Sequence, residues 1–193
     1  MISIIDVGIG NCGSIQNAFD YLEVDAVRTC DPLTIRRSSM LILPGVGHYD
    51  AFMDKIAPIQ GVLNDVVLNQ KVPILGICLG SQIIGSGSEE GNKEGLGWLP
   101  FKVKRFSNSQ VGKVPNMGWL IHSPGERYYY AHSYYIDNAY ANIMDHCEIV
   151  SYGGKKFISN YNVGNIYATQ FHPEKSGKCG LQFLKKLVGK LNV

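Results

Sequence analysis

The sequence feature that most constrains the fold is the apolar run from Pro73 to Ile77, which merges into the pattern Gly76-x-Cys78-x-Gly80. Such a run is typical of a buried strand, and the two glycines permit a sharp turn into a helix. The same geometry lifts the nucleophile out of the sheet in Gly-x-Ser-x-Gly hydrolases. Here the nucleophile would be a thiol at a helix N-terminus, where free N–H groups and the helix dipole favour the thiolate. A buried structural cysteine is the alternative interpretation.

Length and composition indicate an ordinary globular protein. With 193 residues the chain is long enough for one α/β domain, which we expect to span residues 1–193. A net charge of +2 gives no reason to expect a nucleic-acid or membrane partner. The five cysteines form no Cys-x-x-Cys pair, which argues against a disulfide framework or a zinc ribbon. No apolar stretch resembles a signal peptide or a membrane span, so we expect a cytoplasmic protein.

Apolar runs in the first half of the chain alternate with stretches of helical periodicity. Strands are expected over residues 2–5, 25–29 and 40–43, and helices after an Asn11 cap and over residues 48–56 and 59–68. The strand that ends at Cys78 follows as the fourth. Strands that alternate with helices form a parallel sheet, so we expect an open, mostly parallel α/β sheet flanked by helices.

The glycines between the first strand and the first helix form a motif of their own. Gly8, Gly10 and Gly13 match the dinucleotide-binding pattern Gly-x-Gly-x-x-Gly, and Asp31 lies near the position of its acidic residue. A tight first turn in an α/β domain favours glycine in any case. Taken alone, the motif leaves both a phosphate-binding loop and a structural turn open.

The second half of the chain carries mostly strands. A polar loop at residues 85–95 comes first, and aromatic or alternating runs then predict strands over residues 101–106, 117–121, 128–135, 147–152, 157–161 and 165–170. A final amphipathic helix is expected over residues 176–191. We therefore expect additional antiparallel strands in this half.

A catalytic cysteine needs a base, and that base needs an orienting acceptor. Among five histidines, His172 is the candidate, because it follows a predicted strand and begins His-Pro-Glu before the final helix. Pro173 keeps His172 extended, and residues two apart in an extended segment point to the same side, so Glu174 can hold the imidazole. The backbone amides of the turn Pro44–Gly47 can face an oxyanion. No spacing among histidines and cysteines suggests a metal site, and we expect neither metal nor cofactor.

With these motifs in place, the sequence resembles the class I glutamine amidotransferases, and within that class the glutaminase subunits of imidazole glycerol phosphate synthase. The resemblance covers nearly the whole chain. Its motifs are Asp6-x-Gly-x-Gly-Asn11, Leu43-Pro-Gly-Val-Gly47, Gly76-Ile-Cys-Leu-Gly80 with Gln82, Ser88-Glu-Glu90, Met117-Gly-Trp119, His132-Ser-Tyr134 and Gln170-Phe-His-Pro-Glu-Lys-Ser176.

The resemblance implies the class I glutamine amidotransferase fold and a role for each site residue. Cys78 would attack the side-chain amide of L-glutamine, His172 would pass a proton to the departing ammonia, and Glu174 would orient His172. The oxyanion hole would be formed by Gly45, Val46 and Leu79, and L-glutamine would be bound by Gly47, Gln82, Glu90, Ser133 and Tyr134. The glycines from Gly8 to Gly13 then form a structural turn.

The resemblance also implies a partner, because nothing in the pattern supplies an acceptor site for ammonia. In these enzymes ammonia passes to a (β/α)8 barrel synthase subunit, which makes imidazole glycerol phosphate in histidine biosynthesis. The expected assembly is a heterodimer, with Trp119 and Lys175 on the docking face.

Three positions depart from the pattern of the resembling subunits. Asn116 and Leu120 replace a histidine and an asparagine in Pro-His-Met-Gly-Trp-Asn, and Val7 replaces a tyrosine. A related branch, which supplies ammonia for the amidination of surface-polysaccharide sugars through a similar barrel, is therefore an alternative. A regulatory module without activity is a third interpretation, and the intact Cys78, His172 and Glu174 argue against it.

Overall fold

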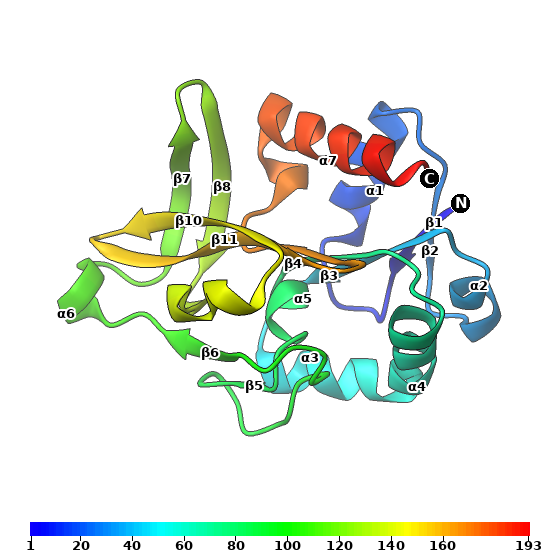
Figure 1. The fold of residues 1–193 in the computed structure, drawn as a ribbon, viewed down its shortest axis with the longest axis horizontal. Helices are drawn as coiled ribbons and strands as arrows, with labels where there is room; N and C mark the ends of the chain where they lie inside the picture. The colour runs from blue at the N-terminus through cyan, green and yellow to red at the C-terminus, as the bar shows by residue number, and fades with distance from the viewer.

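The computed structural model describes residues 1–193 and centres on one seven-stranded mixed sheet (Figure 1). Its strands are β1 (Ile2–Ile5), β2 (Ala26–Thr29), β3 (Met40–Gly45), β4 (Ile74–Cys78), β10 (His146–Tyr152), β11 (Lys155–Val163) and β12 (Ile166–Thr169). The order is β10-β11-β12-β4-β3-β1-β2, parallel from β12 to β2 and antiparallel from β10 to β12. The expected α/β class, with antiparallel strands added by the second half, is confirmed.

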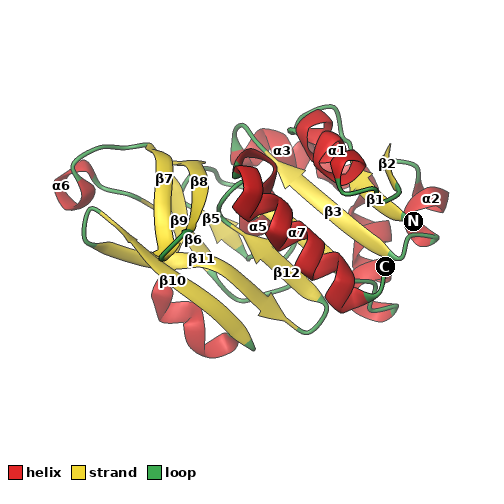
Figure 2. Cartoon of the chain, turned by 90° about the horizontal axis from the view of Figure 1, so that it is seen from above, coloured by secondary structure: helices red, strands yellow, loops and turns green.

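Helices cover both faces of this sheet (Figures 1 and 2). On one face, α1 (Cys12–Tyr21) and α7 (Gly177–Leu191) place Phe19 and Leu184 in one apolar cluster with Ile4. On the other, α3 (Tyr49–Ile56) and α4 (Gln60–Asn64) pack against side chains that include Ile5 and Leu43. Successive side chains of a strand point to opposite faces, so strands covered on both sides must be apolar throughout. This accounts for the uninterrupted burial of β1, β3 and β4.

The helical stretch between β3 and β4 differs from its prediction. Two helices separated at Pro58 were expected, but α3 continues through a 3₁₀ turn (Ala57–Ile59) into α4 and a π-helical turn (Asp65–Asn69). Pro58 lies in the first positions of the 3₁₀ turn, where a backbone N–H has no acceptor within the turn. None of the helices is long and apolar enough to cross a membrane.

Several short helices were not predicted from the sequence. They are α2 (Pro32–Arg36), α6 (Asn108–Val111) and the 3₁₀ helix Asn138–Ile143. The carboxylate of Asp31 caps α2, because it accepts hydrogen bonds from the Thr34 backbone N–H at 2.8 Å and from its hydroxyl at 2.7 Å. The acidic residue of the dinucleotide-like motif therefore has a structural partner.

The remaining strands form a hairpin and a small sheet. The hairpin consists of β7 (Asn116–Ser123) and β8 (Glu126–His132), and the small sheet of β5 (Gly87–Ser88), β6 (Lys102–Arg105) and β9 (Tyr134–Ile136). The stretch from Tyr128 to Tyr135, expected as one strand, divides at Ser133, because β8 pairs with β7 whereas β9 pairs with β6. Aromatic side chains join both parts to the large sheet, among them Phe106, Tyr130 and Phe157.

Candidate functional site

Cys78 lies at the junction between β4 and the short helix α5 (Leu79–Gln82). Its backbone has φ 54° and ψ −110°, a conformation that residues with a side chain rarely adopt and that costs about 1–3 kcal/mol. The residue is 6% exposed and lines a cavity. Such a turn persists only where the surrounding structure holds it in place. We call this junction the Cys78 elbow.

Three glycines interlock the backbones around the Cys78 elbow. A Cβ atom on Gly80 would lie 1.9 Å from the Leu43 carbonyl oxygen, and one on Gly45 would lie 2.2 Å from the Gly80 nitrogen. A Cβ on Gly76 would lie 2.8 Å from the Gly80 oxygen. The first turn of α5 is therefore packed directly on β3 and β4, with no room for a side chain.

His172 and Glu174 lie beside the elbow because β12 pairs with β4 and ends next to Cys78. His172 is extended, as expected from Pro173, and its Nδ1 lies 2.8 Å from Glu174 Oε1. The Glu174 side chain is fully buried, and the same oxygen accepts a hydrogen bond of 2.9 Å from Asn11 Nδ2. Asn11 occupies the N-cap position of α1, as expected, but its side chain makes no cap hydrogen bond.

The positive charge of His172 and the negative charge of Glu174 stabilise each other. Burial opposes a charge on His172, but the Cys78 thiolate and the Glu174 carboxylate outweigh it and raise the pKa of His172 to about 10. Burial also opposes ionisation of Glu174, but hydrogen bonds from His172 and Asn11 hold its pKa below the usual value. The arrangement favours an imidazolium at His172 beside the Glu174 carboxylate, and a neighbouring imidazolium is a group that can activate a cysteine.

The cavity above Cys78 has a volume of about 380 Å³. Its lining residues come from both halves of the chain: Val46, Gly47, Cys78, Leu79, Gln82, Glu90, Pro115, Met117, Ala131, His132, Ser133, Tyr134, His172 and Lys175. Glu90 is the acidic residue of this lining, and burial raises the pKa of its carboxyl group. A bound cation would relieve that cost, so the cavity suits a small ligand with an ammonium group.

Asp50 holds the loop that carries Glu90 in position. Its carboxylate accepts hydrogen bonds from the backbone N–H groups of Asn92 at 3.1 Å and Lys93 at 3.0 Å. Gly91 packs on the same carboxylate, since a Cβ there would lie 2.0 Å from Asp50 Oδ1. The loop is thereby anchored to α3, and Glu90 is directed toward the cavity.

Comparison with known families fits this geometry. The family described as glutamine amidotransferase class-I matches residues 3–188. The chain belongs to this family. Similar proteins include imidazole glycerol phosphate synthase subunit HisH 2 of Methanococcus maripaludis, 38% identical over 97% of this chain and 98% of its own length. Subunit HisH of Methanosarcina acetivorans is 39% identical over 97% of both chains.

Solved structures share the fold at low sequence identity. A crystal structure described as a glutamine amidotransferase superposes with a TM-score of 0.75 at 14% identity, covering 100% of this chain and 99% of the other. The structure of PurLQS from Thermotoga maritima gives 0.66 at 17% identity, with 98% of each chain covered. The glutamine amidotransferase fold thus extends over the whole chain.

The residues predicted for the oxyanion hole lie around the elbow. Gly45 pairs with Cys78 across the β3–β4 ladder, and Val46 follows it at the cavity wall. Leu79 is the first residue of α5, where backbone N–H groups have no acceptor within the helix. The arrangement is compatible with the predicted role, which remains a prediction.

The residues predicted to bind L-glutamine all line the cavity: Gly47, Gln82, Glu90, Ser133 and Tyr134. Gln82 is only 3% exposed, and its Nε2 already donates to the Tyr134 carbonyl oxygen at 2.9 Å and to Gln170 Oε1 at 2.8 Å. Its side-chain amide is therefore anchored before any ligand arrives.

The residues predicted to meet a partner lie at the cavity mouth and on the hairpin. Lys175 is exposed and lines the cavity, and Trp119 is 45% exposed on β7. Met117 and Ile121 alternate with Trp119 and are 64% and 76% exposed. Across the hairpin, Tyr129 and Arg127 stand opposite Trp119 and Ile121, and the Arg127 guanidinium lies 4.9 Å from the centre of the Trp119 ring. We call these five side chains, Met117, Trp119, Ile121, Arg127 and Tyr129, the outer face.

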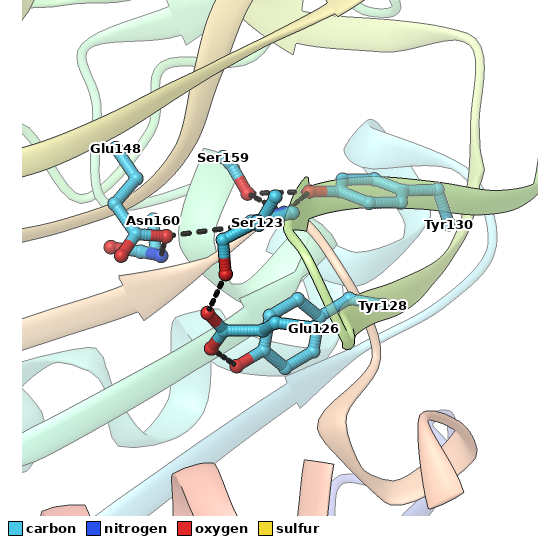
Figure 3. A network of polar contacts seen from close by, with 8 residues as sticks. Ser123, Glu126, Tyr128, Tyr130, Glu148, Ser159 and Asn160 are labelled. Atoms are coloured by element: carbon cyan, nitrogen blue, oxygen red, sulfur yellow. Dashed lines mark hydrogen bonds and ion pairs between the residues drawn. The ribbon is translucent and has the colours of Figure 1, made fainter. Parts of the chain in front are cut away.

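The opposite side of the hairpin is tied to the large sheet by a polar network (Figure 3). His122 Nδ1 lies 2.9 Å from Glu148 Oε2 on β10, and its Nε2 lies 2.7 Å from the Tyr130 hydroxyl. Glu126 accepts hydrogen bonds from Ser123 and Tyr128. A cavity of about 540 Å³ borders this network and α7, away from Cys78. The contacts of His122 with Glu148 and of Tyr130 with Ser159 cross from the hairpin to the large sheet, so this region holds the hairpin in place.

Two of the three residues that differ from the pattern of the resembling subunits, Asn116 and Leu120, have side chains on the inner side of the hairpin. Asn116 is 2% exposed and its Nδ2 lies 3.0 Å from His132 Nε2, whereas Leu120 packs against the aromatic cluster. Burial lowers the pKa of His132 to about 4, so the ring is neutral at physiological pH, with Nδ1 donating to the Tyr134 carbonyl oxygen at 2.7 Å. Neither Asn116 nor Leu120 belongs to the outer face.

Sequence reasoning missed two contacts within the site. Asn11 reaches Glu174, and Gln170 lies 3.6 Å from the Cys78 sulfur. Both residues stand inside motifs that carry the resemblance, which was the available signal. Their partners are far away along the chain, so no local pattern indicated these contacts.

Proposed function

We propose that this chain is the glutaminase subunit of an imidazole glycerol phosphate synthase and hydrolyses L-glutamine to glutamate and ammonia. The observation that carries the proposal is the buried His172–Glu174 pair beside Cys78 on its strained turn, at one cavity. Identities of 38–39% over nearly the full length of subunits with that name support the pathway.

The chemistry follows from the three side chains. The Cys78 thiolate attacks the side-chain carbonyl carbon of L-glutamine, and the tetrahedral intermediate collapses when the protonated His172 gives its proton to the departing ammonia. A glutamyl thioester remains. Water, deprotonated by the now neutral His172, attacks the thioester and releases glutamate, which restores the thiolate and the imidazolium. Glu174 keeps the imidazole in one orientation throughout.

The cavity lining supplies the remaining functions. Backbone N–H groups at Gly45, Val46 and Leu79 are the proposed donors to the negative oxygen of the intermediate. Gly47, Gln82, Glu90, Ser133 and Tyr134 are the proposed contacts of L-glutamine. Among them, the carboxylate of Glu90 is suited to the ammonium group, because burial disfavours its charge and a cation would offset that cost.

The proposed partner is a (β/α)8 barrel synthase subunit that binds the outer face of the hairpin. Exposed aromatic and apolar side chains with an arginine are typical of the centre of a protein interface. This surface adjoins the active site, since Met117 belongs to both the outer face and the cavity lining, where Lys175 also lies. Ammonia released at Cys78 would thus leave toward the partner.

All five cysteines are free, which supports a cytoplasmic location.

Replacing the nucleophile tests the proposal. In a complex with the barrel subunit, Cys78→Ala should abolish glutamine-dependent formation of imidazole glycerol phosphate, because no thioester can form. Free ammonia should still support the partner's reaction. Cys30→Ala, which changes an exposed cysteine, is the matched control and should retain glutamine-dependent synthesis. Product formation from glutamine in the Cys78→Ala complex would disprove the role of Cys78.

A barrel that amidinates a polysaccharide sugar is the alternative partner. The two departures that suggested it, Asn116 and Leu120, lie on the inner side of the hairpin and leave the outer face unchanged. Mixing the purified chain with each type of barrel and its acceptor separates the two. Glutamine-dependent product with the sugar-amidinating barrel alone would replace the proposed pathway.

A further inference from the structure

Gln170 is a buried side chain without a role in the mechanism above, yet it touches the reacting sulfur. It directly follows β12, is 2% exposed, and stands next to Cys78 because Thr169 pairs with Ile77. Its Nε2 lies 3.6 Å from Cys78 Sγ, a hydrogen-bonding distance for sulfur. The Ala131 carbonyl oxygen lies 4.0 Å from the same sulfur. One of these neighbours can donate a hydrogen bond, and the other can only accept one.

The neighbours of Gln170 determine which end of its amide faces the sulfur. Gln82 contacts the Tyr134 carbonyl oxygen at 2.9 Å, and a carbonyl only accepts, so the NH₂ group of Gln82 must lie there. The same NH₂ group lies 2.8 Å from the Gln170 side chain, which must therefore present its oxygen. The NH₂ group of Gln170 is left facing Cys78. The orientation thus follows from the hydrogen-bond chain.

We propose that Gln170 donates a hydrogen bond to the Cys78 thiolate and that Gln82 holds the Gln170 amide in the orientation for this bond. The proposal rests on the role of Cys78 as the nucleophile. A donor to an ionised acceptor forms a bond about twice as strong as a neutral pair. The Ala131 carbonyl, in contrast, can pair only with the protonated thiol. Gln170 is thus a second group, besides His172, that favours the thiolate.

The same chain limits how Gln82 can contact L-glutamine. Both hydrogens of its NH₂ group are used, one by Tyr134 and one by Gln170. Only its oxygen is free to act as an acceptor in the cavity. A hydrogen bond from the substrate to that oxygen would polarise the Gln82 amide and strengthen its bond to Gln170. Gln82 therefore links substrate recognition to the nucleophile.

The test is the rate of Cys78 alkylation by iodoacetamide as a function of pH. The Cys78 peptide is followed by mass spectrometry, because three other cysteines are exposed or partly exposed. Gln170→Met keeps a side chain of similar length without the donor, and the midpoint of its profile should rise by about one pH unit. An unchanged midpoint in the folded variant would overturn the proposal.

Thr169→Val is the matched control. It removes a buried hydroxyl from the preceding residue, which donates to the Phe171 carbonyl oxygen at 2.9 Å and makes no contact with the sulfur. Its midpoint should equal that of the parent protein. A shift as large as that of Gln170→Met would mean that any loss at this position perturbs Cys78, and it would contradict a specific hydrogen bond.

Two further variants cover the possibility that Gln170→Met does not fold. Gln170→Glu keeps the acceptor for Gln82 but adds a negative charge beside the sulfur, so its midpoint should rise by more than one unit. Gln82→Met in the parent background should raise the midpoint by less than about one pH unit, and an unchanged midpoint there would contradict a role for Gln82. Where Gln170→Met does fold, Gln82→Met should add nothing to its shift. If the midpoint shifts of the two single variants added up in the double variant, Gln82 would not act through Gln170.

Failure of this proposal can be told apart from failure of the glutaminase assignment. Iodoacetamide alkylates a thiolate without glutamine binding, so the midpoints report on Gln170 whether or not the chain turns over glutamine. An affinity label built on glutamine addresses the assignment itself. Absence of Cys78 labelling in the parent protein would contradict the proposed function, whereas labelling together with unchanged midpoints would contradict only the role of Gln170.

Discussion

One wall of the cavity around Cys78 comes from the central sheet, and the other comes from the end of the β7–β8 hairpin. The sheet wall is held by backbone packing, with Gly45 and Gly80 leaving no room for a side chain. The hairpin wall is held mainly by side chains, through the polar network of Figure 3 and the aromatic cluster, beside one backbone hydrogen bond of 2.9 Å from the His172 N–H to the Tyr129 carbonyl oxygen. Backbone packing thus supports Cys78, while side-chain contacts support the wall next to the outer face.

Each wall carries one buried histidine, and the pKa values of these two side chains differ in direction between the walls. The pKa of His172 is raised to about 10, whereas that of His132 is lowered to about 4. Both rings are 2–6% exposed, so burial alone does not decide the direction. Cys78 and Glu174 decide it for His172, whereas His132 has hydrogen bonds only with the uncharged Asn116 and the Tyr134 carbonyl, and the charge of His172 lowers its pKa further. The sheet wall therefore carries a charged histidine, and the hairpin wall carries a neutral one.

The largest effect is expected from a substitution that disrupts the backbone packing of the sheet wall. Gly80→Ala places a methyl group against the Leu43 carbonyl oxygen, so we expect the free energy of unfolding to fall by about 4 kcal/mol or more. Gly13→Ala, in an open position of α1, is the control and should raise it by about 0.5–1 kcal/mol. Urea denaturation followed by circular dichroism measures both. A loss below about 1 kcal/mol for Gly80→Ala would show that the backbones are not interlocked.

A smaller expected effect tests the charges on the sheet wall. Glu174→Gln should lower the rate of glutamine hydrolysis by about 10²- to 10⁴-fold, because the imidazole loses its orienting anion. The mechanism needs a protonated His172, so in the parent complex the rate should fall only as the pH rises through about 10. In the variant this decrease should begin about 1–3 pH units lower, since a counter-charge is missing.

The ammonia-dependent rate of the barrel subunit, measured over the same pH range, is the control for that experiment. It does not involve Glu174 and should be equal in both complexes. If the two glutamine profiles fell at the same pH, Glu174 would not be the group that keeps His172 protonated.

The smallest expected effect concerns the hairpin wall. Trp119→Ala on the outer face should weaken binding of the barrel subunit by about 10- to 100-fold, as expected for an exposed aromatic residue at the centre of an interface. Tyr21→Ala removes a 75% exposed aromatic ring from α1 and should leave the affinity unchanged. Isothermal titration calorimetry measures both. Equal affinities for the two variants would remove Trp119 from the docking face.

Much of the central sheet could be predicted because its strands are covered on both faces. The runs Ile2–Ile5 and Met40–Leu43 are apolar almost without interruption, a pattern that few other structures produce. The pairing of His172 with Glu174 was predictable too, because Pro173 restricts the local backbone and sets both side chains on one side.

Features that depend on distant partners could not be predicted. The stretch from Tyr128 to Tyr135 is aromatic throughout, so its pattern shows no break at Ser133, where the pairing strand changes from β7 to β6. Asn11 has the residue type of a helix cap, but a buried carboxylate far along the chain claims its side chain. The helices α2 and α6 have too few turns to show a period.

The hydrogen bond between Asn11 and Glu174 joins residues 163 positions apart. During synthesis, Cys78 leaves the ribosome long before β12 and the His-Pro-Glu segment are made. The nascent chain then holds a thiol without a base, and β4 still lacks its β12 neighbour. His172 is made shortly after β12, and β12 is the strand that pairs with the free edge of β4. The order of translation thus leaves Cys78 without His172 and Glu174 until the surrounding sheet can close over it.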